Sequence, residues 1–307
     1  MFVKVPKVSI IIPTFNRKEY LKECLNSVLT QDYKNLEIII SDDNSTDKTE
    51  ILVKEYQKKF PFIKYVKNTK YPKGPNGNKN NGLDYAIGEI VGILDDDDFL
   101  IEKNAITLMV DKINNGYDVV MCNCVRSDDN TFSGKGIEES REVFYEEMLC
   151  GKLHGEFWSL YKREVIGNKR FDTDLYGGEG TLWKQIVKGK KIFYIHKAFR
   201  LYRIHRDSVT HLNYVYASKV IKNYERDIEY FGKEMKKKCP CYLATIYKGA
   251  SYYAKILGEY KKGFKYIFES IKLCPKYKAS YVMFLVMFLP KKIIPFLSKV
   301  RRFFGKN

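Results

Sequence analysis

The stretch that most constrains the fold is residues 90–100, where the apolar run Ile-Val-Gly-Ile-Leu leads directly into Asp95, Asp96, Asp97 and Asp98. An apolar run that ends in charge predicts a buried strand whose carboxyl end opens into a crevice. Ligands bind at that edge of open α/β sheets. Adjacent carboxylates repel one another, and a divalent cation bound through oxygen shares their charge. The stretch predicts a metal site for a phosphate-bearing ligand; a solvated acidic turn is the alternative.

Three further strands are predicted upstream of this stretch, at residues 8–12, 36–40 and 63–66. The segments between them have helical spacing, and strands that alternate with helices indicate a mostly parallel, layered α/β sheet. Asp42 and Asp43 follow the second strand, as the four aspartates follow the last one. Because a parallel sheet brings such strand ends to one edge, we expect both acidic clusters in a single nucleotide crevice.

Several polar residues mark where the intervening helices begin. Asn16 is expected to cap the first helix. Asp47 and Glu50 have the spacing of a capping box and predict the start of a second helix. The Pro and Gly residues within 72–77 predict a loop, after which residues 78–86 are expected to be helical.

The net charge of +17 belongs almost entirely to the end of the chain. Residues 214–307 contain 21 Lys and Arg against 6 Asp and Glu, whereas the preceding residues hold 33 and 31. We therefore divide the chain into an α/β domain, residues 1–213, and a basic, aromatic, helical region, residues 214–307. Within that region, residues 244–277 have the pattern of a tetratricopeptide-like helix pair, which we expect to pack on the α/β domain.

The last segments predict contact with a membrane surface rather than a membrane span. Apolar residues at 281–289 and 293–297 alternate with Lys and Arg, a pattern typical of helices that lie in the interface. A solvated helical bundle is the alternative. The longest apolar run ends at Pro290, too short to cross a bilayer, and the N-terminus lacks a signal core, so we expect no export. The seven scattered cysteines are expected to be reduced.

A basic chain with many tyrosines also fits a nucleic-acid binder, because cations bind phosphates and aromatic rings stack on bases. The basic excess lies in the tail, however, and an anionic polymer would avoid the acidic edge of the sheet. We therefore expect no nucleic-acid partner. A nucleotidyltransferase also uses a carboxylate-held metal on an α/β sheet, but it would release pyrophosphate.

Four segments carry a family resemblance: Val-Ser-Ile-Ile-Ile-Pro-Thr-Phe-Asn-Arg at 8–17, Asp-Asp-Asn-Ser-Thr-Asp at 42–47, Asn-Lys-Asn-Asn-Gly at 78–82, and Gly-Glu at 88–89 before the four aspartates. In this order they resemble bacterial family 2 glycosyltransferases of the GT-A fold. The resemblance covers roughly residues 5–213. It implies an α/β fold in which a Rossmann-like, nucleotide-binding mixed sheet is flanked by helices, with the C-terminal region as a helical, basic appendage.

The resemblance implies where the nucleoside of a UDP-sugar would bind. Pro13 and Thr14 should line the nucleobase pocket, and Asp43 should accept a hydrogen bond from the uracil imide. A carboxylate, which only accepts, suits that donor. Asp42 and Asp47 are expected to brace the loop and its helix instead.

It also implies how the diphosphate would be held. Lys79 stands where the family often has arginine and should neutralise a phosphate as a point charge, with an exposed helix lysine as the alternative. Asp95 resembles the residue that contacts the ribose, and Asp96 is placed beside it in donor binding. Asp97 resembles the ligand of Mg²⁺ or Mn²⁺, a cation that offsets the charge of the departing nucleoside diphosphate.

An inverting transfer needs one base to deprotonate the attacking hydroxyl. Aligned on Leu-Trp at 182–183, Glu179 falls where the family has its catalytic aspartate. The sequence departs from the pattern here, because Glu is a methylene longer and Gly178 replaces the customary preceding acid. A charge at a helix N-terminus is the structural alternative for Glu179, and Asp172 and Asp174 are the fallback bases.

The segment Tyr-Arg-Ile-His-Arg-Asp-Ser-Val-Thr at 202–210 resembles the closing segment of the family. It implies that Arg203 and His205 approach the diphosphate, with His205 as a second metal ligand. A structural histidine is the alternative. Trp158 lies where the family forms its acceptor side, although core packing is the commoner role of a tryptophan.

Segments around 74–84 and 95–100 look similar to glucosyltransferases that add a branching glucose to lipid-linked N-glycan precursors. The resemblance implies UDP-glucose as donor and an undecaprenyl-diphosphate-linked oligosaccharide as acceptor. It places the enzyme peripherally at the cytoplasmic face of the inner membrane. Transfer from UDP-galactose or a UDP-N-acetylhexosamine, for lipooligosaccharide or capsule, is the alternative.

Overall fold

The computed structural model of this chain describes residues 5–175, 177–204 and 215–290. The chain divides into two compact units, residues 1–173 with 182–205, and residues 174–181 with 206–307. The predicted boundary after residue 213 falls in a segment outside the described residues and stays a prediction.

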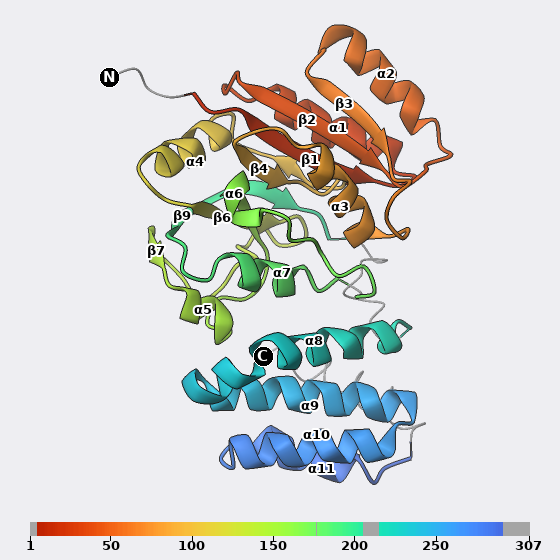
Figure 1. Cartoon of the computed structure of the whole chain (residues 1–307), viewed down its shortest axis with the longest axis vertical. Coiled ribbons are helices and arrows are strands. Elements are labelled where there is room, and N and C mark those ends of the chain that lie inside the picture. Colours follow the sequence, from red (N-terminus) through yellow and green to blue (C-terminus); the bar gives the residue numbers. More distant parts are fainter. Residues whose placement is uncertain (1–4, 176, 205–214, 291–307) are drawn as a thin grey trace. The chain divides into compact units, whose positions relative to one another are not determined.

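The first unit is built on one mixed β-sheet (Figure 1). Its strands are β1 (Val8–Thr14), β2 (Leu36–Asp42), β3 (Ile63–Lys67), β4 (Ile90–Ile93), β5 (Phe99–Leu100), β6 (Val119–Arg126), β7 (Arg141–Val143), β8 (Phe157–Lys162) and β9 (Ile192–Tyr202). They are ordered β3-β2-β1-β4-β8-β6-β9-β5, and β7 pairs with β9.

The parallel part of the sheet confirms the predicted layered α/β arrangement. β1 lies between β2 and β4 and runs parallel to both, and β3 runs parallel to β2. β8 pairs antiparallel with β4 and β6, which makes the whole sheet mixed, as the family resemblance implied. The strand order changes direction at β1, and this switch point is where open α/β sheets bind ligands.

Helices cover the sheet and close its core. They are α1 (Lys18–Leu29), α2 (Thr49–Lys59), α3 (Pro75–Tyr85), α4 (Ala105–Asn114), α5 (Tyr145–Leu149), α6 (Arg163–Ile166) and α7 (Glu179–Ile186), the last of which begins in the second unit. α3 packs on β1 and β2, and α2 packs on β3 (Figure 1). Ile10, Ile12 and Leu25 belong to the fully buried core, and each such side chain contributes roughly 1.5–3 kcal/mol by leaving water.

The first two helices do not begin as predicted. Asn16 does not cap α1, because its backbone is left-handed at φ 53° and the N-cap position belongs to the next residue. Asp47 serves α1 instead: its Oδ2 accepts a hydrogen bond from Lys18 N at 2.9 Å, while its Oδ1 accepts one from Thr49 N at 3.2 Å. The capping box with Glu50 is absent, since Glu50 forms ion pairs on the surface of α2 and β3. One loop aspartate therefore ties the starts of two helices together, which confirms its bracing role.

The second unit is a stack of helices (Figure 1). It contains α8 (Ala217–Lys238), α9 (Pro240–Leu257), α10 (Tyr260–Leu273) and α11 (Lys278–Val286). α9 and α10 are antiparallel neighbours, which confirms the helix pair predicted over residues 244–277; α8 packs on α9, and α11 packs on both α9 and α10. Across the three described ranges, no helix combines the length and the apolar character needed to cross a membrane.

A disulfide in this unit corrects the expectation of reduced thiols. Cys241, in the first turn of α9, is bonded to Cys274, which follows the last residue of α10. The antiparallel packing of the two helices brings these ends together across 33 residues of sequence, with their Cα atoms 4.9 Å apart. The pairing could not be predicted from the sequence, because the two cysteines are far apart along the chain. Cys24, Cys122 and Cys124 are free and buried in the first unit.

A buried lysine fixes the end of α11. Lys255 of α9 is fully buried, and its Nζ donates hydrogen bonds to the carbonyl oxygens of Met287 and Leu289, each at 2.7 Å. Burial lowers the pKa of Lys255. A buried cation without such partners costs several kcal/mol, so the two carbonyls and the ammonium hold each other in place.

Candidate active site

The candidate site lies where β1, β2 and β4 end, the edge at which the crevice was predicted, and a buried polar helix fixes the geometry of this edge. Asn78 of α3 donates from Nδ2 to the carbonyl oxygens of Thr14, at 3.0 Å, and Ser41, at 2.8 Å. Asn80 exchanges two hydrogen bonds with the backbone of Phe171. These bonds tie α3 to the ends of β1 and β2 and to the backbone of Phe171. α3 begins three residues earlier than predicted, at Pro75, and its side chains are buried from Asn76 to Leu83.

One hydroxyl and one guanidinium group contact Asp96 and Asp97 at this edge. Asp96 Oδ2 accepts a hydrogen bond from Thr14 Oγ1 at 2.7 Å, and Arg17 Nη1 lies 3.3 Å from Asp96 Oδ1 and 2.7 Å from Asp97 Oδ2. Burial raises the pKa of Asp96 to about 7, although Thr14 and Arg17 act in the opposite direction. Asp97 keeps 17% of its side chain exposed, whereas Asp98 is buried. Because Asp96 and Asp98 are buried, the cluster is not a fully solvated acidic turn, although Asp95 keeps 41% of its side chain exposed.

Lys79 lies inside the crevice rather than on an exposed helix face. Its Nζ is 3.0 Å from Asp95 Oδ1, and only 9% of its side chain is exposed. Burial would raise the pKa of Asp95, but Lys79, Arg200 and Arg17 outweigh burial and lower it overall. A cation bridging α3 and the acidic cluster is well placed to receive a phosphate, a role that stays a prediction.

Arg200 of β9 is the main residue that the sequence reasoning missed. Its side chain is buried, and Nε lies 3.5 Å from Asp98 Oδ2 while Nη2 lies 3.4 Å from Glu156 Oε2. Burial raises the pKa of Asp98 to about 7, and Arg200 opposes that rise. An arginine inside an otherwise apolar strand run, Ala-Phe-Arg-Leu at 198–201, is the signal that could have pointed to a buried ion pair.

Replacing Arg200 with methionine is expected to lower the free energy of unfolding by about 3–5 kcal/mol, because it leaves Asp98 buried without its counter-ion. Urea denaturation followed by circular dichroism measures this change. Arg126→Met is the matched control: Arg126 pairs with Asp128 at the surface, and its loss should cost about 1 kcal/mol or less. Equal stability of the Arg200 and Arg126 variants would contradict a buried pair.

The two aspartates after β2 have different surroundings. Asp42 is fully buried and accepts hydrogen bonds from Ser45 N, at 2.8 Å, and from the hydroxyl groups of Ser45 and Tyr65. This confirms its bracing role. Asp43 accepts from Asn68 Nδ2 at 2.9 Å and from Gly74 N at 2.7 Å, which fixes its orientation and leaves each oxygen a second lone pair. Its contact with uracil stays a prediction.

Arg203 is engaged at the start of α1 in this structure. Its Nη2 lies 2.5 Å from Glu23 Oε2, its guanidinium lies over the Tyr20 ring, and its backbone N donates to Asp98 Oδ1 at 2.9 Å. The backbone bond joins the closing segment to the acidic cluster, whereas contact of the guanidinium with a diphosphate stays a prediction. His205, the second predicted metal ligand, lies outside the described residues.

Trp158 belongs to the core. It is 1% exposed, and its Nε1 donates to the carbonyl oxygen of Ile93 at 2.9 Å. This confirms core packing and argues against a sugar platform. The bond braces β4 just before the acidic cluster begins.

Glu179 is the first residue of α7 and belongs to the second unit. Gly178 before it has φ +78°, and an added Cβ would lie 3.0 Å from both Asn223 Oδ1 and Leu175 Cδ1. A side chain would be strained on this backbone, so glycine suits the position. Asp174, a fallback base, lies 3.0 Å from Lys222 Nζ and 3.3 Å from Arg226 Nη2. Burial would raise the pKa of Asp174, but these cations lower it overall.

The acidic cluster offers carboxylate oxygens, which suit a hard divalent cation, but it does not supply a complete set of metal ligands. Within residues 5–175, 177–204 and 215–290, no three His, Cys, Asp or Glu side chains are grouped to hold a metal. Asp97 presents a partly exposed carboxylate, and Asp98 Oδ2 is buried with no hydrogen bond inside the described part of the chain. Mg²⁺ typically uses one or two carboxylates and completes its shell with water and substrate phosphates. The residues present fit that kind of site.

This sheet, with its strand-end carboxylates at the switch point, has the arrangement expected of the GT-A fold. Residues 9–174 match the family described as Glycosyl transferase family 2. A relative from Campylobacter jejuni, GalNAc(5)-diNAcBac-PP-undecaprenol beta-1,3-glucosyltransferase, is 43% identical over 99% of this chain and 100% of its own length. The chain belongs to glycosyltransferase family 2.

Other comparisons agree with this assignment. An Escherichia coli relative, UDP-Glc:alpha-D-GlcNAc-diphosphoundecaprenol beta-1,3-glucosyltransferase WfgD, is 28% identical over 66% of this chain and 79% of its own length. The S. aureus TarS 1–349 structure in complex with UDP-GlcNAc has a TM-score of 0.61 and 18% identity, covering 90% of this chain and 91% of that one. Mannosyltransferase PcManGT from Pyrobaculum calidifontis, in complex with GDP-Man and Mn²⁺, has a TM-score of 0.59 and 19% identity, covering 99% and 89%.

Proposed function

We propose that this glycosyltransferase moves glucose from UDP-glucose to a hydroxyl group of an undecaprenyl-diphosphate-linked oligosaccharide, with inversion at the anomeric carbon. The observation that carries the proposal is the 43% identity, over both units, to an enzyme whose name states a glucosyl transfer to such an acceptor. The name of the E. coli relative states the same donor and the same class of lipid.

The residues of the crevice supply binding and charge for the donor. In the proposal Pro13, Thr14 and Asp43 hold the nucleoside, and Asp95 and Asp96 hold the ribose side. Lys79 and Arg203 receive the diphosphate, and their positive charge stabilises the UDP that departs.

A divalent cation, Mg²⁺ or Mn²⁺, would be held by Asp97 and His205, and it supplies Lewis-acid stabilisation of the leaving diphosphate when bound. Glu179 removes the proton from the attacking acceptor hydroxyl. One base suffices because a single displacement inverts the anomeric carbon.

The acceptor fixes where the reaction takes place. A polyprenyl diphosphate is embedded in a membrane, so the enzyme works at a membrane surface. Because the donor UDP-glucose is supplied from the cytoplasm, the proposal assigns the enzyme to the cytoplasmic face. Peripheral contact through residues 214–307 is part of the proposal. The proposal includes no membrane-spanning helix within residues 5–175, 177–204 and 215–290, because no helix there is long and apolar enough to cross a membrane.

A donor screen tests this function. Purified enzyme is incubated with an undecaprenyl-diphosphate oligosaccharide and, separately, UDP-glucose, UDP-galactose, UDP-N-acetylglucosamine and UDP-N-acetylgalactosamine, and released UDP is measured. We expect release with UDP-glucose alone and a product heavier by one hexose. Release of UDP only with UDP-galactose or a UDP-N-acetylhexosamine would overturn the donor assignment in favour of that alternative.

A further inference from the structure

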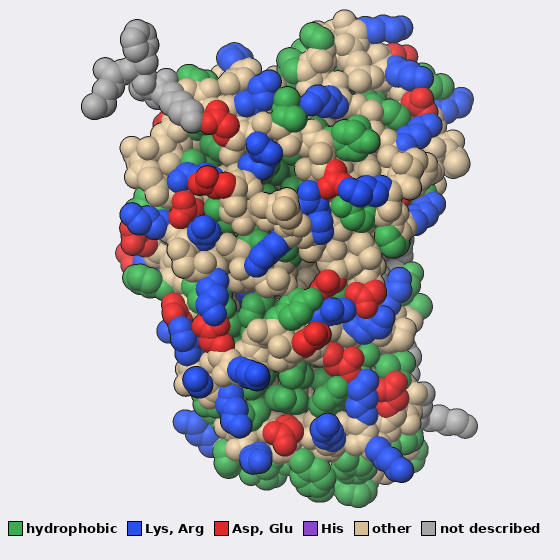
Figure 2. Space-filling view, viewed as in Figure 1, with side chains coloured by type: hydrophobic (Ala, Val, Ile, Leu, Met, Phe, Trp, Pro, Cys, Tyr) green, Lys and Arg blue, Asp and Glu red, His purple; other side chains and the backbone are tan. Residues whose placement is uncertain are grey.

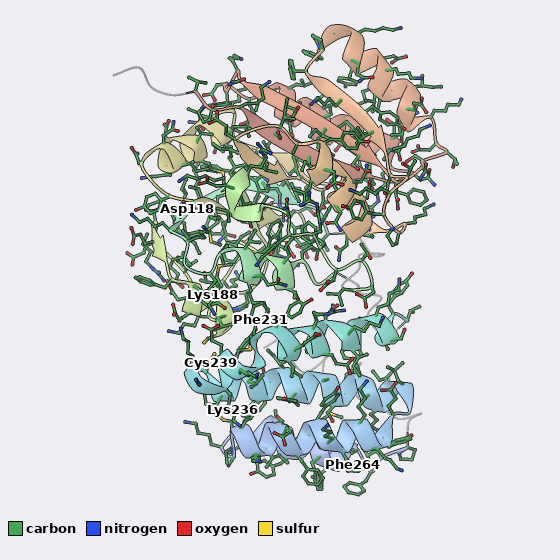
Figure 3. The ribbon with its side chains drawn as sticks, viewed as in Figure 1. Asp118, Lys188, Phe231, Lys236, Cys239 and Phe264 are labelled. Carbon is green, nitrogen blue, oxygen red and sulfur yellow. A yellow bond between two sulfur atoms is a disulfide. The ribbon has the colours of Figure 1, made fainter. Side chains whose placement is uncertain are left out.

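The helical unit carries an apolar surface on α10 and α11 that other elements within residues 215–290 leave exposed. Four rings meet there, Phe264 and Phe268 of α10 with Phe284 and Phe288 at α11, and we call them the aromatic rim. Neighbouring ring centroids lie 5.3–6.4 Å apart. Phe268 is 55% exposed and Phe288 is 66% exposed. Figure 2 shows hydrophobic side chains gathered over these helices at the bottom of the view, and Figure 3 labels Phe264 at that edge.

Helix α11 is apolar on both of its faces. Met283 and Met287 point inward and are buried, whereas Val282 is 60% exposed and Leu285 is 66% exposed. Residues 279–289 contain no charged side chain. A helix on the surface of a water-soluble protein normally has a polar outer face, so this outer face fits an apolar environment.

The aromatic rim is held rigidly. Lys255 bonds the carbonyl oxygens of Met287 and Leu289, which flank Phe288. Ser251 Oγ donates to Gly263 O at 2.9 Å and joins α9 to α10 one residue before Phe264. These buried bonds fix the backbone next to Phe264 and on both sides of Phe288.

The segment of sequence that carries this surface is rich in lysine. Residues 260–307 contain twelve Lys and Arg and one acidic residue, Glu269. Among the described residues, Lys272, Lys276 and Lys278 are exposed. Lysines beside an apolar face match the two layers of a bilayer containing anionic lipid, whose headgroups attract cations and whose acyl region accepts apolar side chains.

We propose that the aromatic rim seats the enzyme on the surface of an anionic bilayer, with Lys272, Lys276 and Lys278 on the headgroups. This deepens the proposed function, on which it rests, because a lipid-linked acceptor is presented at that surface. A second copy of the chain would bring like charges together at this face. The segment 291–307, with six Lys and Arg and no acidic residue, would do the same. Lipid is the occupant that complements both the charge and the apolar surface.

Vesicle co-sedimentation of the full-length enzyme tests this proposal. We expect binding to phosphatidylglycerol–phosphatidylcholine vesicles and much weaker binding to phosphatidylcholine alone. Phe268→Gln combined with Phe288→Gln should weaken partitioning about tenfold or more, because apolar rings no longer leave water. Lys276→Gln should weaken it about fivefold, and only on the anionic vesicles. Phe144→Gln is the matched control: Phe144 is 63% exposed in the first unit, and its variant should bind as wild type does.

Unchanged vesicle binding by the double Phe variant would overturn the proposal, and so would equal weakening of binding by Phe144→Gln. A third contrary outcome is a double Phe variant that changes its oligomeric state on ultracentrifugation while its vesicle binding stays intact. That result would assign the face to a second copy of the chain. UDP release with an acceptor on a short, water-soluble prenyl chain separates this result from the proposed function. The double Phe variant should retain that activity. Vesicle binding without any use of UDP-glucose would refute the function and leave the bilayer contact standing.

Discussion

Replacing Asp97 with alanine is expected to lower kcat for glucosyl transfer by about a hundredfold to a thousandfold, the usual effect of removing one preorganised group that stabilises developing charge. Asp97 is one of two partly exposed carboxylates in the cluster, so its loss should leave the fold intact. Excess EDTA should reduce wild-type activity to a similar level, and added Mn²⁺ or Mg²⁺ should restore wild type but not the variant.

Asp128→Ala is the matched control for that experiment. Asp128 is an aspartate of the same unit, paired with Arg126 at the surface and 43% exposed. Its variant should transfer glucose and respond to EDTA as wild type does. Full activity of Asp97→Ala, or of wild type in thoroughly chelated buffer, would remove the carboxylate-held cation from the mechanism.

Glu179→Gln is expected to lower the transfer rate by about a hundredfold or more while UDP binding is unchanged. Glutamine keeps the size and polarity of the side chain but cannot accept the proton of the attacking hydroxyl, and a positioned base typically contributes that much. Single-turnover transfer measures the rate, and isothermal titration with UDP measures the binding.

Asp174→Asn separates the two candidate bases. Asp174 is paired with Lys222 and Arg226, so it is committed to holding α8, and its amide variant should transfer at nearly the wild-type rate. The reverse pattern, normal turnover in Glu179→Gln and loss in Asp174→Asn, would move the base to Asp174.

Much of the fold was predictable because its determinants are local in sequence. The strands β2 and β4 are apolar runs that lead into acidic residues, and that pattern places the site at the edge of a parallel sheet. The helix pair α9 and α10 follows from apolar spacing. Trp158 lies in the core, as the common role of tryptophan predicted, because a tryptophan in a strand run buries a large surface.

What escaped prediction depends on contacts between distant residues. Arg200 pairs with Asp98, which is 102 positions away in the chain, and no local pattern near β9 identifies Asp98 as the partner. Asp47 serves α1 through a loop 29 residues away, so the local candidate Asn16 was the wrong choice. The Cys241–Cys274 disulfide likewise depends on which helix ends meet.

The family pattern is the basis for the roles assigned to Pro13, Asp43, Lys79 and Glu179. Substitution of each residue will test whether it has that role.

The three cations around the acidic cluster have a consequence for how the polypeptide matures. Arg17, Lys79 and Arg200 together face all four carboxylates, so the chain itself nearly neutralises the crevice. We therefore expect newly synthesised enzyme to fold without a metal ion, and under the proposed mechanism a cell short of manganese or magnesium would accumulate intact but idle protein that becomes active once the ion returns.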